Sequence, residues 1–295
     1  ADFSQRARQF KAIGLTEPKV GINDIAALAD QVYIKVRISV VLFNQLDNLV
    51  ALGHASHDFL VAHLVEEGIG LGAGDVVPTH VGCLPDLQCV VLLGFDVDGV
   101  SSWLNRDPSY ADHPSLMSMA EYGPSVATPR ILDMLDAHGI PASFYVPGYV
   151  AETHEDMVRE IARRGHEVAH HGYMHEPPSS LTREREIEVI ESGIRILSGI
   201  TGEAPLGYRS PSWELSEHSL EILTDHGFIY DSSLMGDDAP YIVDSPANGK
   251  TIVELPIHWL LDDAPNFVYA PVANRLGPMR NPDEVYGTWA AEFEG

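Results

Sequence analysis

The pattern of hydrophobic and polar positions divides the chain near residue 86. From Leu87 onward, short apolar runs alternate with amphipathic stretches, which predicts strands that alternate with helices. Strands that alternate with helices pair in parallel through right-handed crossovers, so we expect an α/β fold. The predicted strands cover 90–96, 142–146, the histidine-containing stretch after 165, 207–209, 228–232 and 252–259. The predicted helices cover 128–138, 155–164, 182–198, 217–226 and 282–293.

Local signals mark the ends of two of these helices. Thr128 stands at the expected N-cap of the first helix, Pro129 at its first helical position, and Gly139 just after its end. The helix over 182–198 has a threonine N-cap and early glutamates, which suit the positive end of the helix dipole.

Residues 1–86 follow another pattern, with a predicted helix at 22–32, a strand at 33–43 and a helix at 55–67. The glycine-rich stretch 68–74 is not followed by a helix, so we interpret it as a flexible connection and not as a dinucleotide loop. His54, His57 and His63 are interpreted as surface or packing residues. We expect this segment to pack on, or complete, a main domain that covers 87–295.

The composition limits the kinds of partner that the protein can bind. The 295 residues include 43 acidic and 18 basic side chains, a net charge of −25, which opposes binding to nucleic acid or to an anionic membrane. A small neutral or cationic substrate fits this charge better. No secretory signal and no membrane-spanning stretch is visible, so we expect a cytoplasmic protein, although a chain already trimmed of a leader would look the same. Cys83 and Cys89 are interpreted as small buried residues.

Candidate chemistry gathers at the predicted strand ends. Asp96 and Asp98 end the first apolar run, where residues two apart on a strand face the same side. His171 and His175 follow the third strand. One carboxylate and two neutral imidazoles suit a single divalent cation, zinc first, with cobalt, nickel or iron as alternatives. The second aspartate is then available to accept a proton.

Other polar and aromatic residues fall at later strand ends, where the active sites of parallel barrels lie. Each alone has an ordinary explanation, since aspartates cap helices, paired histidines occupy polar helix faces and arginines bridge loops. Their occurrence in one order argues for a shared site. We predict substrate contacts for Trp103, Tyr173, Pro211, Trp213, Asp231 and Trp259.

At this point the chain resembles the polysaccharide deacetylase family, also called the NodB-homology family or carbohydrate esterase family 4. Phe95-Asp96-Val97-Asp98-Gly99 is similar to its first motif, His171 and His175 to its second, and Arg209-Ser210-Pro211-Ser212-Trp213 to its third. The resemblance implies a distorted (β/α) barrel, TIM-like but with fewer than eight regular strands. It also implies roles: Asp96 as base, Arg209 as the residue that holds it, Asp98, His171 and His175 as metal ligands, and Trp213 in the groove wall.

Three further stretches, 101–104, 121–123 and 259–263, resemble a branch with peptidoglycan-deacetylase-like proteins, cyclic imide hydrolases and metal-independent allantoinases. The resemblance to this branch also implies a homo-oligomer. The implied activity is metal-dependent hydrolysis of non-peptide carbon–nitrogen bonds, with removal of N-acetyl groups from amino sugars as the first reading. Ring opening of a cyclic imide or ureide, and an inactive sugar-binding module, are the alternatives.

The general acid is where the chain departs from the family, which places a histidine on a strand that would follow Gly295. Three explanations stay open: an incomplete chain, a strand at 33–43 followed by His54 or His57, or His258. We prefer His258 as the third catalytic residue beside Asp96 and Arg209, because we expect it at a strand end next to Trp259.

Overall fold

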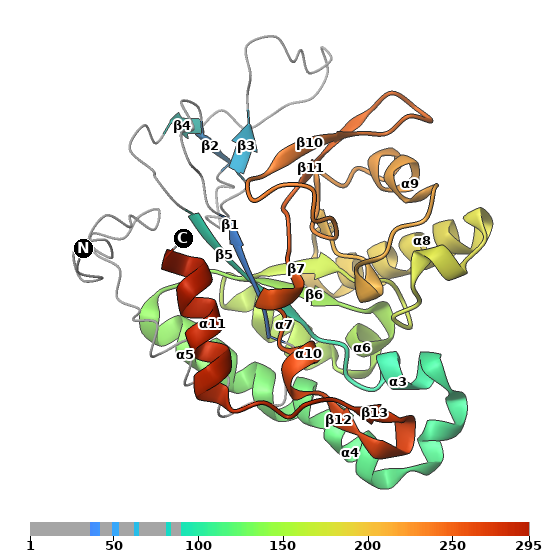
Figure 1. Ribbon diagram of the computed structural model, residues 1–295. Coiled ribbons are helices and arrows are strands. Elements are labelled where there is room, and N and C mark those ends of the chain that lie inside the picture. The colour runs from blue at the N-terminus through green and yellow to red at the C-terminus, as the bar shows by residue number, and fades with distance from the viewer. Residues whose placement is uncertain (1–35, 42–48, 53–61, 65–80, 84–89, 295) are drawn as a thin grey trace.

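The computed structural model describes residues 36–41, 49–52, 62–64, 81–83 and 90–294. Its centre is a strongly curled, mostly parallel sheet with the strand order β1-β5-β6-β7-β8-β9-β11-β10 (Figure 1). The parallel strands are β5 Val90–Asp96, β6 Ser143–Val146, β7 Glu167–His170, β8 Gly207–Tyr208, β9 Tyr230–Asp231 and β11 Thr251–Glu254. The edge strands β1 Val36–Val41 and β10 Tyr241–Asp244 are antiparallel to their neighbours. The predicted α/β fold with a distorted barrel is confirmed.

Helices connect the strands and cover the sheet (Figure 1). They are α3 Ser101–Arg106, α4 Pro114–Tyr122, α5 Thr128–His138, α6 Gly148–Thr153, α7 Glu155–Arg163, α8 Arg183–Thr201, α9 Ser219–Asp225, α10 Ala264–Phe267 and α11 Pro282–Glu294. A short hairpin, β12 Tyr269–Ala270 and β13 Arg275–Leu276, follows α10. None of the helices in the described ranges is long and apolar enough to cross a membrane.

Most predicted elements of the main domain are present, with three corrections. Strand β11 ends at Glu254, several residues before the predicted end at 259. Thr128 does not cap α5, because the chain enters this helix through a π-helical turn at Gly123–Ala127 and the Thr128 hydroxyl donates to the Gly123 carbonyl. The predicted elements do not include helices α3, α4, α6 and α10, strand β10 or the β12–β13 hairpin.

The described parts of the N-terminal segment are strands. β1 falls within the predicted strand at 33–43 and pairs antiparallel with β5, from Val36 opposite Phe95 to Val41 opposite Val90. A second small sheet has the order β3-β2-β4, with β2 Leu49–Leu52, β3 Ala62–Leu64 and β4 Val81–Cys83. The predicted helix at 55–67 is wrong at β3, where pairing with β2 overrides the local helical spacing.

Other predictions for this segment fall outside the described residues. They are the helix at 22–32, the glycine-rich connection at 68–74, His54, His57 and Cys89.

The main core lies between the first parallel strands and their helices. Phe95 of β5 and Phe144 of β6 are buried and stack with ring centroids 5.0 Å apart. Ile131 and Leu135 of α5 and Trp289 of α11 belong to the same buried cluster. This packing fixes the carboxyl end of β5, which is where Asp96 and Asp98 stand.

Candidate active site

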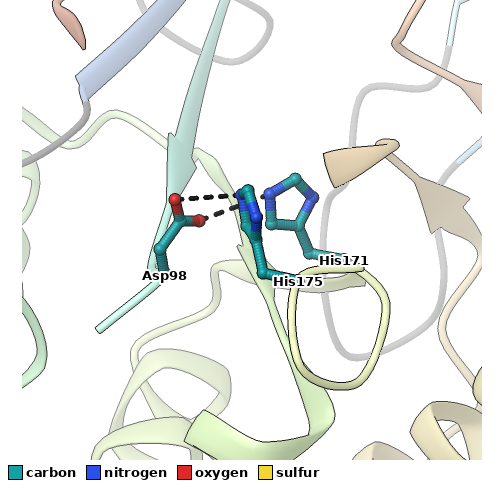
Figure 2. Close-up of side chains that lie close together, drawn as sticks. All are labelled: Asp98, His171 and His175. Atoms are coloured by element: carbon teal, nitrogen blue, oxygen red, sulfur yellow. Dashed lines mark ion pairs between the residues drawn. The ribbon is translucent and has the colours of Figure 1, made fainter. Parts of the chain in front are cut away.

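Three ligand side chains meet at the carboxyl ends of β5 and β7. The Nε2 atom of His175 lies 3.1 Å from Oδ2 of Asp98, and the Nε2 atom of His171 lies 3.3 Å from Oδ1 of the same carboxylate. One ligand atom from each residue lies within 4.8 Å of the others, and all three side chains are buried. Figure 2 shows them pointing toward one another. This donor set suits a divalent cation such as zinc, and its three protein ligands would leave coordination positions for water and substrate.

The protonation of His171 is set by the main chain. Its Nδ1 atom lies 2.6 Å from the carbonyl oxygen of Arg209. A carbonyl oxygen can only accept, so Nδ1 carries the proton and Nε2 presents its lone pair toward Asp98. Such an outer hydrogen bond fixes the ring orientation of a metal-binding histidine.

Asp96 lies beside this group and is held from the other side by Arg209. Its Oδ2 is 3.4 Å from Nε2 of His171, and its Oδ1 accepts from a guanidinium nitrogen of Arg209 at 2.9 Å. The other guanidinium nitrogens donate to the carbonyl and hydroxyl oxygens of Ser232, at 3.0 and 2.8 Å. Arg209 is completely buried and lies over the Tyr145 ring, 3.9 Å from its centroid. One carboxylate is therefore paired with a fixed cation, while Asp98 faces the two histidines.

A glycine makes room for this arginine. A Cβ atom on Gly94 would lie 2.9 Å from one Arg209 nitrogen and 3.1 Å from another, closer than van der Waals contact allows. Gly94 also pairs with Ser143 in the sheet, so the backbone of β5 cannot easily retreat. The absence of a side chain at 94 lets the guanidinium reach Asp96.

Backbone strain is concentrated at the site. His175, Ser212 and Trp213 have φ angles of 61°, 61° and 56°, in the left-handed region that residues with a side chain seldom adopt. Such residues cost about 1–3 kcal/mol each and persist only where the surroundings hold them. The left-handed turn at His175 brings its ring back to Asp98, and Asn105 holds the His175 carbonyl at 3.2 Å.

A cavity of about 360 Å³ opens beside the triad. Asp96, Asp98 and His175 form part of its wall, and Trp103, Met119, Trp259, Phe267 and Tyr269 contribute apolar surface. A cavity of this size lies at the lower end of the range for small-molecule sites.

The predicted substrate contacts divide into two groups. Trp103 and Trp259 line the cavity, and Trp213 stacks on Trp259 with ring centroids 4.3 Å apart. Tyr173, Pro211 and Asp231 are not in the wall of this cavity, and substrate contacts stay a prediction for them. The Tyr173 hydroxyl donates to Glu152 on α6.

Pro211 and Asp231 are buried outside the cavity wall. Pro211 is buried against Gly172, where a Cβ atom would come within 3.1 Å of its ring. Asp231 is completely buried, lies opposite Tyr208 in the register and accepts from the hydroxyl of Ser233.

His258 does not stand at a strand end, because β11 stops at Glu254. It caps a short 3₁₀ turn over 259–261, and its Nδ1 accepts from the Leu260 amide at 3.1 Å. Its side chain is exposed and is not part of the cavity wall as described. Its role as general acid stays a prediction.

The other two histidines of the cluster, His166 and His170, serve packing. His170 is buried between Tyr208 and Phe228, and burial lowers its pKa to about 3, so the ring is neutral. His166 is buried against Phe144. Residue spacing alone could not separate these rings from the two candidate ligands.

A buried carboxyl pair was missed by the sequence reasoning. Asp231 of β9 lies opposite Glu254 of the parallel neighbour β11, and both are completely buried. Burial raises the pKa of Asp231 to about 6, and burial together with the Asp231 charge raises the pKa of Glu254 well above its ordinary value. The signal available in the sequence is that each of the two residues directly follows a short apolar run.

Comparison with known proteins agrees with this geometry. The sequence profile of the family described as polysaccharide deacetylase matches residues 110–230. A Helicobacter pylori peptidoglycan deacetylase is 32% identical over 231 residues, which cover 70% of this chain and 78% of that protein.

Two solved structures share the fold. A crystal structure of a Mycobacterium smegmatis protein assigned to the polysaccharide deacetylases is 40% identical, with a TM-score of 0.64 over 68% of this chain and 70% of that chain. Puue allantoinase is 26% identical, with a TM-score of 0.53 over 62% of this chain and 58% of that chain.

Proposed function

The chain belongs to the polysaccharide deacetylase family, and we propose that it removes N-acetyl groups from an amino-sugar substrate. The family is one of metal-dependent hydrolases that act on carbon–nitrogen bonds. The observation that carries the proposal is the convergence of Asp98, His171 and His175 beside a second carboxylate that Arg209 already neutralises. A metal site alone needs only the first three residues, whereas hydrolysis also needs a base.

The metal ligands of this proposal are Asp98, His171 and His175. They would hold a divalent cation, for which zinc is our first choice, and when bound it lowers the pKa of water and polarises a carbonyl oxygen. Within the protein, the His171 proton on Nδ1 is kept by the Arg209 carbonyl, so Nε2 stays available as a ligand without a change of tautomer.

Asp96 is the proposed general base. Its carboxylate faces the triad at 3.4 Å from His171, close enough to take a proton from a water molecule there. Arg209 holds the carboxylate in place with a charge-assisted hydrogen bond. The leaving nitrogen must then receive a proton, and His258 is our proposed donor.

The aromatic residues around the cavity suit a ring-shaped substrate. Trp103 and Trp259 offer apolar faces, and the buried Trp213 supports Trp259 from behind. We propose small-molecule or amino-sugar partners for this surface, since the net charge of −25 disfavours nucleic acid.

The proposal is tested by measuring acetate release from N-acetylglucosamine oligomers by the full chain supplied with zinc or cobalt. We expect release that His171→Ala abolishes. If the protein is folded by circular dichroism and releases no acetate with either metal, the proposal is contradicted.

A second candidate is ring opening of a cyclic imide or ureide. It is supported by the likeness to Puue allantoinase and by a cavity of only about 360 Å³. This candidate is tested beside the acetate assay by measuring ring opening of succinimide, which is monitored as a loss of absorbance. Ring opening without acetate release would favour this candidate over the first.

A further inference from the structure

Two arginines belong to the wall of the same cavity as the metal ligands. Arg106 is the last residue of α3, and Arg275 is the first residue of β13. Both side chains are exposed, and neither guanidinium forms an ion pair with a carboxylate of the described residues. Two cations therefore face the space in which a substrate would bind.

This arrangement stands out because the protein is strongly acidic, with 43 acidic and 18 basic side chains. Most other described cations are engaged with carboxylates. They are Arg159, Arg163, Arg164, Arg183, Arg185, Arg209 and Lys250. Arg106 and Arg275 differ in having each other as charged neighbours. Partial burial in the cavity wall and the charge of Arg275 both lower the pKa of Arg106, as expected for like charges that lie close together.

No ion pair joins these two arginines to the described carboxylates of the cavity wall, all of which are buried. Asp96 is paired with Arg209, and Asp98 faces the two histidines. Asp262 and Asp263 are buried, and Asp262 accepts from the Ala264 amide at 3.1 Å. The exposed charged side chains of this wall are therefore the two arginines.

The two arginines are carried by packed elements. Ala270 of β12 and Ala273, in the turn before β13, are buried in one cluster with Leu116 of α4, and Trp103 of α3 packs against it. Figure 1 shows the β12–β13 hairpin beside α4. The hairpin and α3 thus share a small core that holds Arg106 and Arg275 on the same wall.

We propose that Arg106 and Arg275 bind a carboxylate carried by the substrate, in the cavity where its amide is cleaved. Guanidinium groups are planar and can each give a carboxylate two parallel hydrogen bonds. Trp103 and Trp259 would contact the body of the same molecule. The inference rests on the proposed function, because it names the class of substrate that the hydrolase site takes: an N-acylated compound with an acidic group.

The test compares N-acetylmuramic acid with its methyl ester, which keeps the same body and amide but lacks the negative charge. We expect the full chain to prefer the acid in kcat/KM, and the preference to fall as ionic strength rises. Arg106→Gln/Arg275→Gln should reduce the ratio of acid to ester by about tenfold, the size of a lost charge-assisted hydrogen bond. Arg195→Gln removes an exposed charge outside the cavity and should leave the ratio as it is.

Calorimetric titration with the acid and the ester separates this inference from the proposed function. Tighter binding of the acid without turnover, lost in the double variant, would support the arginine site and contradict the hydrolase proposal. Turnover of both compounds with no preference would overturn the arginine site alone. If the double variant does not fold, Arg275→Lys replaces it, because lysine keeps the charge and loses the paired hydrogen bonds. The inference is overturned if the unaltered chain shows no preference for the acid and Arg275→Lys leaves the ratio of acid to ester unchanged.

Discussion

Arg209 supports His171 through its main chain and Asp96 through its side chain. Its carbonyl oxygen accepts the Nδ1 proton of His171 at 2.6 Å, and its guanidinium donates to Asp96 at 2.9 Å. One residue of the third motif therefore sets the tautomer of a candidate metal ligand and the position of the candidate base. This explains why the two groups lie 3.4 Å apart in a fixed relation.

Metal content is the first prediction. We expect about one divalent ion per chain after dialysis against zinc, measured by elemental analysis, because three buried ligand atoms converge. Asp98→Ala and His171→Ala should each lose the ion. His218→Ala, which removes a half-buried histidine near Glu217, is the matched control and should retain it. Equal metal content in all four proteins would remove the triad from this role.

Asp96→Asn should lower kcat by about 10²–10⁴-fold, the usual contribution of a general base. The amide keeps the shape of the side chain and can still accept from Arg209, so metal content should be unchanged. Parallel loss of metal and activity would mean that Asp96 serves as a ligand and not as the base.

The role of His258 is tested with leaving groups of different basicity. If His258 protonates the departing nitrogen, His258→Ala should slow hydrolysis of amides far more than hydrolysis of activated esters, whose leaving groups need no proton. An equal effect on both, or none, would exclude this role. Its exposed position makes a loss of folding in this variant unexpected.

The buried pair Asp231 and Glu254 should make stability depend on pH. Both carboxyls have raised pKa values in the folded chain, to about 6 for Asp231, so between about pH 4 and 6 the folded state holds protons that the unfolded state has lost. The free energy of unfolding should therefore fall as pH rises through this window.

Glu254→Gln tests this dependence, because the amide can still accept from the amides of Ser233 and Leu234 and can donate to Asp231. Urea unfolding from pH 4 to 8 should show a flatter profile, with a gain of about 1–2 kcal/mol at pH 8. Glu203→Gln changes an exposed glutamate and should keep the original slope.

Two glycines of α8 give opposite expectations. A Cβ atom on Gly193 would lie 2.0 Å from the buried ring of His170, so Gly193→Ala should lower the free energy of unfolding by about 1–3 kcal/mol. Gly199 has nothing within 4 Å of that position, and Gly199→Ala should raise it by up to about 1 kcal/mol. Destabilisation of equal size at both sites would contradict the packing described for His170.

The sequence by itself determined the α/β class, the succession of strands and helices along the main domain and the residues that could hold a metal. Period and length of the apolar runs reveal strands and helices, and parallel pairing brings their carboxyl ends to one edge. Asp98, His171 and His175 could be named for this reason.

Only the tertiary structure decided what neighbouring residues do. His170 and His171 are adjacent in the chain, yet one packs beneath Tyr208 and the other faces Asp98, because successive residues at the end of a strand point to opposite sides. The pairing of Asp231 with Glu254 and the nearness of Arg106 to Arg275 depend on contacts between distant segments. No pattern of residue spacing in the sequence reveals such contacts, since burial and charge act through space and not along the chain.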